Sequence, residues 1–374
     1  MTDIKERKLN PYDPFDNPTE NCAYRTDYRM IEPAIGQPGY ELPLLPEKAE
    51  RKRIRSCFNT VGAGLLLGAV FVNVAFYLIF MVLEIIMAGG GDFSALMDVE
   101  NYINYRSSIM MGLNGLLFLI ANAVPAVVGC HITGIRVRTL FRPLDVKKSC
   151  IVRYMTIGIF IQAITGILYT LLNSLMEAGG IQDYTPEIDT FFSAKSIVVS
   201  GLYTCLIAPV TEELLYRGFV LKNLSRVSQR FGIIISAVLF GLAHENIAQF
   251  VLAVPAGIFM ARIAVKHNSL IPSILVHMAV NTLAFIMEWV YATLPMTGTG
   301  IALSYALDAV YYFIAAAGLV FWISELRKNR LPANTIRQSY RGARIALTSP
   351  CLVAICVFHG VMALLVIVSQ NLMA

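Results

Sequence analysis

The chain has 374 residues, of which 56% are hydrophobic and 15% are charged. Because a soluble globular domain typically has about a quarter charged residues, this composition excludes an ordinary soluble domain. The net charge of +5 does not indicate nucleic-acid binding, because the basic residues cluster in the segments that connect the apolar stretches.

Residues 1–55 precede the first apolar stretch and are predicted to form a flexible cytoplasmic tail. They are polar, contain many prolines and show little helical periodicity. These residues have no early apolar core of the kind that marks a secretory signal peptide. The tail ends in the basic block 48–55 (KAERKRIR), which is typical of a cytoplasmic juxtamembrane segment. Residues 56–374 are assigned to a transmembrane domain.

Apolar stretches follow one another along the rest of the chain. A helix needs about 20 residues to cross a hydrocarbon core of ~30 Å. The expected spans are 57–87, 109–130, 151–176, 196–224, 231–250, 251–265, 270–291, 304–324 and 350–369. The sequence therefore predicts an all-α, polytopic integral membrane bundle of eight or nine transmembrane helices.

The charges of the connecting segments alternate along the chain. Residues 89–106 and 177–195 are acidic, whereas residues 131–153 and 327–344 are basic. All basic segments fall on the side of the N-terminal tail, so the positive-inside rule places the N-terminus in the cytoplasm, with the cell membrane as the expected location. The two halves show no sequence repeat of the kind found in many transporters.

Residues 211–219 (TEELLYRGF) place two carboxylates and an arginine inside an expected span. Charged groups in a membrane need partners and commonly mark functional sites. Glu213 and Arg217 are four residues apart on one helical face, so we predict an ion pair between them. Glu212 points about 100° away and is left free of Arg217, with Tyr216 as its neighbour four residues on.

Two histidines and an asparagine lie in the apolar segments that follow. Counted from the cytoplasmic ends at about 1.5 Å per residue, Glu212, His244, His277 and Asn281 all lie roughly 10–20 Å from the cytoplasmic edge. Three expected helices therefore bring polar side chains to a similar depth. Phe240, one turn before His244, is expected to wall the same site.

This set of side chains supports two chemistries. In one, Glu212 is the general base for a water that His244 also holds, and His277 and Asn281 stabilise the oxyanion. In the other, Glu212, His244 and His277 bind Zn²⁺ with an open fourth position. Zinc is not required by the sequence, because Ala248 stands where an HExxH motif needs its second histidine. An inert bundle with buried hydrogen bonds is disfavoured, since such costly groups recur at one depth.

Three motifs carry a family resemblance: Glu212-Glu213-x-x-x-Arg217, Phe240-x-x-x-His244 and His277-x-x-x-Asn281. In order and spacing they resemble those of the CPBP family, which comprises type II CAAX prenyl endopeptidases and bacteriocin-processing or self-immunity (Abi) proteins. The resemblance covers a protease core at about 196–290. It implies an intramembrane endopeptidase of about eight core helices, with a cavity open toward the cytoplasm.

The resemblance also implies residue roles. Glu212 would activate water, His244 would position it, and His277 with Asn281 would form the oxyanion site. Glu213 and Arg217 would support Glu212. Both a metalloprotease and a metal-free glutamate mechanism are proposed for the family, so Zn²⁺ stays open here. The long tail, the basic stretch 327–344 and the last span depart from the family pattern.

The predicted function is hydrolysis of a peptide bond in a membrane-tethered or lipidated protein or peptide, with CAAX-prenylated proteins included. The expected partners are that substrate and membrane lipids, with no nucleic acid. The alternative is a non-proteolytic membrane scaffold or bacteriocin self-immunity protein that binds a membrane partner. Two further residues have no assigned role: His359 in the last span is expected to pack or to face lipid, and Glu245 to border the site or lie in an exposed turn.

Overall fold

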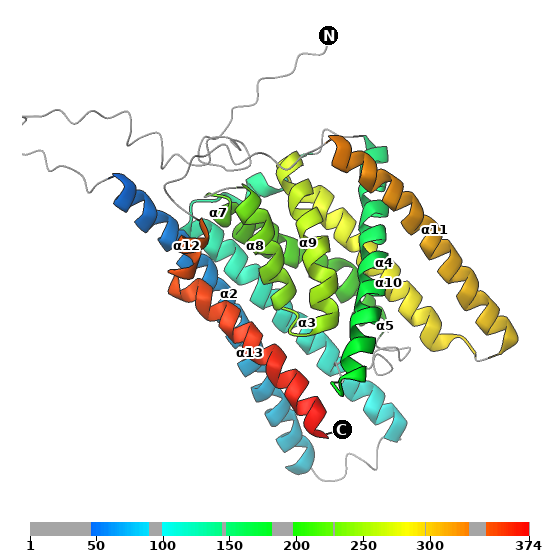
Figure 1. Cartoon of the computed structure of the whole chain (residues 1–374). Helices are drawn as coiled ribbons and strands as arrows, with labels where there is room; N and C mark the ends of the chain where they lie inside the picture. Colours follow the sequence, from blue (N-terminus) through cyan, green and yellow to red (C-terminus); the bar gives the residue numbers. More distant parts are fainter. Residues whose placement is uncertain are drawn as a thin grey trace, which may run out of the picture.

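A computed structural model describes residues 46–89, 99–143, 147–181, 197–226, 229–295, 297–328 and 342–373. These ranges contain helices and turns and no strand, which confirms the all-α prediction (Figure 1). Residues 1–45 of the predicted tail and residues 329–341 of the basic stretch lie outside the described residues.

Long helices account for most of the described chain. They are α2 (Pro46–Gly89), α3 (Val99–Ile132), α4 (Lys148–Ala178), α8 (Gln229–Leu242), α9 (Ile247–His267), α10 (Ile271–Thr293), α11 (Gly298–Lys328) and α13 (Pro350–Met373). Two short helices, η2 (Val137–Leu140) and α12 (Gly342–Leu347), lie in connections.

Between α4 and α8 the chain forms one composite helix over Ile197–Leu224. It alternates between α-helical and π-helical turns, in the order α5 (Ile197–Leu202), η4 (Tyr203–Ile207), α6 (Ala208–Glu212), η5 (Glu213–Val220) and α7 (Leu221–Leu224). Both η4 and η5 are π-helices. Such π-helical turns are rare and often lie at functional sites.

Eight helical stretches within the described ranges are long and apolar enough to cross a membrane. Large apolar side chains are exposed on the outer helices, among them Leu175 of α4 at 72% and Phe313 of α11 at 78%. In water such surfaces would drive aggregation, whereas lipid tails solvate them. The chain is therefore an integral membrane protein, as the sequence predicts.

In the bundle, α8 and α9 lie between α2 and α13 on one side and α4 and α11 on the other (Figure 1). On one side α2 packs against α3 and α13, so the first and last described helices are neighbours. On the opposite side α11 packs against α4. The composite helix touches α3, α8 and α10, so its carboxylates lie among several helices.

The structure corrects two boundaries of the prediction. Helix α2 begins at Pro46, so the block 48–55 is helical and not part of a flexible tail; proline is favoured at such a helix start. The expected span 231–250 is not one helix, because α8 ends at Leu242 and α9 begins at Ile247. Asn246 caps α9 by accepting a hydrogen bond from the Gln249 N–H at 2.8 Å, a capping signal that competes with helix continuation.

The contact between α2 and α13 depends on a glycine. A Cβ at Gly62 would lie 2.3 Å from backbone atoms of Cys351 and Leu352 in α13. Gly62→Ala is expected to destabilise the protein by about 1–3 kcal/mol through overpacking. The midpoint of thermal unfolding in detergent should fall relative to Gly166→Ala in α4, where a Cβ meets nothing within 4 Å. Equal midpoints would contradict this close approach of the two helices.

Candidate active site

A cavity of about 870 Å³ opens in the interior, between α3, α4, the composite helix, α9 and α10. Its wall contains the four predicted catalytic residues, Glu212, His244, His277 and Asn281, together with Tyr216 and Phe240. Glu213 and Arg217, which the resemblance assigns to the support of Glu212, are fully buried behind this wall. The structure thus brings the predicted residues together, while their roles stay predictions.

The Glu213–Arg217 pair lies deepest in this region. Arg217 Nη1 is 2.8 Å from Glu213 Oε1, and both side chains are 0% exposed. The guanidinium carbon also lies 4.4 Å from the centre of the Phe240 ring, in a cation–π contact. Gly257 of α9 makes room for this group, because a Cβ there would be 3.2 Å from Arg217 Nη2. The ion pair predicted from the four-residue spacing is therefore present.

His277 lies between the two adjacent glutamates. Its Nδ1 is 3.1 Å from Glu213 Oε1, and its Nε2 is 3.7 Å from Glu212 Oε2. An ionised carboxylate only accepts hydrogen bonds, so Nδ1–H donates to Glu213 and the other nitrogen faces Glu212. The resemblance implies that Glu213 and Arg217 support Glu212, and this role stays a prediction. Glu213 contacts the His277 ring, and that ring lies 3.7 Å from Glu212.

His244 lies in the turn 243–246, beyond the end of α8. In a continued helix its backbone N–H would bond to the Phe240 carbonyl, but it donates to Gly241 O at 3.2 Å. The Phe240 carbonyl, which lacks this helical donor, is hydrogen-bonded to His244 Nδ1 at 2.8 Å instead. A carbonyl only accepts, so Nδ1 carries the proton of the neutral ring and Nε2 keeps a lone pair. The end of α8 therefore fixes both the orientation and the tautomer of this ring.

Asn281 is held by the π-helical turn η4. The Thr204 carbonyl would ordinarily accept from residue 208, but the Ala208 N–H donates to the Tyr203 carbonyl. The next residue, Pro209, has no N–H to offer. Asn281 Nδ2 donates to the Thr204 carbonyl at 3.1 Å instead. One N–H of the amide is thereby committed, and the second N–H and the amide oxygen are left for the cavity.

Aromatic rings connect these groups. The Phe240 ring packs edge-on against Tyr216, His244 and His277, with centroid distances of 5.1, 5.0 and 5.8 Å. Both imidazoles thus lie against one rigid apolar ring, which limits their rotation. Phe240 walls the site as expected, and Tyr216 belongs to the same cluster.

The structure adds a contact that sequence reasoning missed. Glu245, next to His244, accepts a hydrogen bond from His359 Nδ1 of α13 at 2.8 Å. His359 is buried at 6% exposure, so it neither faces lipid nor merely fills space. The two residues are 114 positions apart. No local pattern signals such a pair, and only the presence of a histidine in an apolar span pointed to it.

The three side chains suggested as zinc ligands, Glu212, His244 and His277, all line the cavity, and zinc binding by them stays a prediction. Within the part of the chain that the structure describes, no group of three His, Cys, Asp or Glu side chains lies close enough to hold an ion. His277 has one nitrogen bonded to Glu213 and the other 3.7 Å from Glu212.

Comparison with known proteins agrees with the motifs. Residues 194–283 match the family model described as Rce1-like, type II CAAX prenyl endopeptidase. This stretch covers roughly a quarter of the chain and includes the glutamate pair, both histidines and Asn281. No curated protein and no solved structure matches the chain. The match confirms the family resemblance and supports a membrane-embedded CAAX-type endopeptidase in general terms.

The buried ion pair makes a stability prediction. Glu213→Leu should lower the free energy of unfolding by about 3–5 kcal/mol, because the Arg217 guanidinium cannot lose its proton and stays buried without its carboxylate. Adding Arg217→Met should recover most of that loss, since an apolar pair of similar volume replaces both ions. Denaturant unfolding in detergent measures both changes. A double variant as unstable as Glu213→Leu alone would show that the two charges are not coupled.

Proposed function

We propose that this membrane protein is an endopeptidase that hydrolyses a peptide bond in a membrane-tethered or lipidated protein, CAAX-prenylated proteins included. The observation that carries the proposal is the shared cavity of Glu212, His244, His277 and Asn281 inside a bundle of apolar helices. The family match of residues 194–283 supports the same class of reaction.

In the proposed mechanism, Glu212 is the general base. Its carboxylate takes a proton from a water molecule as the water oxygen attacks the carbonyl carbon of the substrate. The lone pair on His244 Nε2 accepts a hydrogen bond from the second O–H of that water, which orients the oxygen. The tetrahedral intermediate then loses its amine, and Glu212 returns the proton to the leaving nitrogen as the C–N bond breaks.

The negative charge on the substrate oxygen needs donors on the other side of the site. The second N–H of Asn281 is one, held in place by its bond to the Thr204 carbonyl. The second is the His277 ring, which Glu213 holds from behind at 3.1 Å. Donors fixed before the reaction stabilise developing charge without reorganisation, which is why each contributes strongly.

The cavity also suits a substrate with an apolar part. A volume of about 870 Å³ falls within the usual range of ligand sites, roughly 300–1,000 Å³. A smaller cavity of about 300 Å³ lies beside it, and Phe118, Tyr216 and Glu245 line both. Apolar residues of α2 and α3 make up much of the smaller wall, which suits a hydrocarbon chain. A polar centre beside a cavity that is apolar along part of its wall suits a lipidated peptide.

We also propose that the protein lies in the plasma membrane and that its N-terminus is in the cytoplasm. The start of α2 and the connections α7–α8 and α9–α10 lie at one end of the bundle (Figure 1). Basic residues gather there, among them Arg53, Arg226, Arg230 and Lys266. Such residues are enriched on the cytoplasmic side of membrane proteins.

Glu212→Gln is expected to reduce cleavage of a farnesylated CaaX peptide by about 10²–10⁴-fold, because glutamine cannot accept the proton of the attacking water. The assay uses the purified full chain in detergent or in vesicles. Glu177→Gln, at an exposed position in α4, is the matched control and should cleave at the wild-type rate. Wild-type cleavage by Glu212→Gln would contradict the proposed base and would favour a non-proteolytic scaffold or immunity protein.

Removal of metal ions is expected to leave the rate unchanged. The proposed mechanism uses a carboxylate, two imidazoles and an amide, and no three described ligands converge on an ion. The measurement is turnover of the same peptide after treatment with phenanthroline and dialysis. Loss of turnover that added Zn²⁺ restores would contradict the metal-free mechanism.

A further inference from the structure

The turn 243–246, which carries His244, has an unusual backbone. Glu245 adopts a left-handed conformation with φ of 56°, which residues with a Cβ rarely adopt. Asn246 caps α9 through the Gln249 N–H and donates its Nδ2–H to the His244 carbonyl at 2.9 Å. The turn is therefore strained at one residue and tied down at the next.

Glu245 is anchored from a distant part of the chain. His359 Nδ1 lies 2.8 Å from Glu245 Oε1, and the side chain of Glu245 is 23% exposed. The bond joins the turn to α13, which otherwise packs mainly on α2. An ionised carboxylate can accept a hydrogen bond but cannot donate one, so the imidazole is the donor whether it is neutral or charged.

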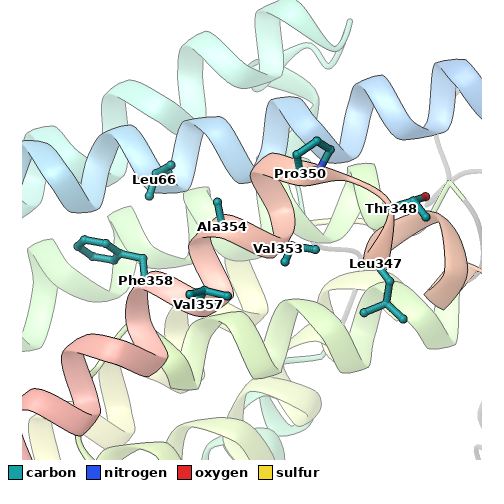
Figure 2. A pocket seen from close by; sticks show the side chains of 8 residues that line it. All are labelled: Leu66, Leu347, Thr348, Pro350, Val353, Ala354, Val357 and Phe358. Carbon is teal, nitrogen blue, oxygen red and sulfur yellow. The ribbon is translucent and has the colours of Figure 1, made fainter.

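Helix α13 also reaches the cavities. His359 lines the smaller cavity, and Val366, about two turns further on, lines the larger one. The opposite face of α13 points away from the site. Figure 2 shows Val353, Ala354, Val357 and Phe358 of this helix along an apolar groove that Leu66 of α2 completes. One face of α13 therefore lines the cavities, and another face points away from them.

We propose that the Glu245–His359 pair positions His244, so that α13 is part of the active site although it lies outside the family-matched residues 194–283. The backbone of His244 belongs to this turn and precedes Glu245, whereas its ring is bonded to the Phe240 carbonyl at the end of α8. The position of Nε2 therefore depends on the turn as well as on α8. His359 is a positioning residue, since it acts on the reaction through this turn.

The inference rests on the proposed function, so its test has one arm that does not depend on activity. In His359→Leu, the backbone amides of residues 243–246 should exchange with deuterium faster than in the wild type, because the turn loses its anchor. Val357→Ala, on the outward face of the same helix, should leave exchange in the turn unchanged. His359→Gln should restore protection, because its amide N–H can donate to Glu245.

The second arm measures cleavage of the farnesylated peptide. His359→Leu should lower kcat by about 10–100-fold with little change in KM, because displacement of a water-positioning group by about 1 Å costs up to ~10²-fold. His359→Gln should recover most of kcat, and Val357→Ala should match the wild type. Unchanged exchange in His359→Leu, unchanged kcat, or equal effects in Val357→Ala would each overturn the proposal. If the wild-type protein cleaves no peptide, the proposed function is wrong. The exchange measurement would still decide whether His359 holds the turn.

Discussion

The buried contact between Glu213 and Arg217 constrains the rest of this structure. Two charges with no exposure inside a membrane bundle are costly, about 3 kcal/mol each at the centre of a helix, unless partners surround them. Arg217 contacts the Phe240 ring, Glu213 contacts the His277 imidazole, and Gly257 leaves room for the guanidinium. The contacts of the pair therefore place two walls of the cavity. The cavity thus lies against the Glu213–Arg217 ion pair, and separating the two side chains would leave a buried charge without its partner.

Breaks in regular helix supply the other fixed points. At η4, Pro209 and the displaced Ala208 hydrogen bond leave a carbonyl that holds Asn281. At the end of α8, a carbonyl without its helical donor holds His244. In a membrane, freed backbone groups must find partners within the protein, so these bonds are strong restraints on the side chains. The same irregularities that interrupt the helices orient the proposed catalytic groups.

Much of this arrangement can be predicted from the sequence. The spans, the Glu213–Arg217 pair and the common depth of Glu212 and the histidines follow from helical spacing and the cost of burying charge. The turn after Leu242 was missed because His244 lies in an apolar run, although the Asn246 cap signalled it. The bond of Glu213 to His277 and that of Glu245 to His359 could not be predicted, because they join helices far apart in sequence.

In the proposed mechanism, the buried ion pair acts on the reaction through the His277 ring. The direct measurement compares peptide cleavage by three proteins: Glu213→Leu/Arg217→Met, His277→Ala, and the chain with all three changes. If the pair works through His277, removing it from a chain that already lacks the ring should cost no further activity. If the two losses multiply, the pair serves another part of the site and the account is wrong.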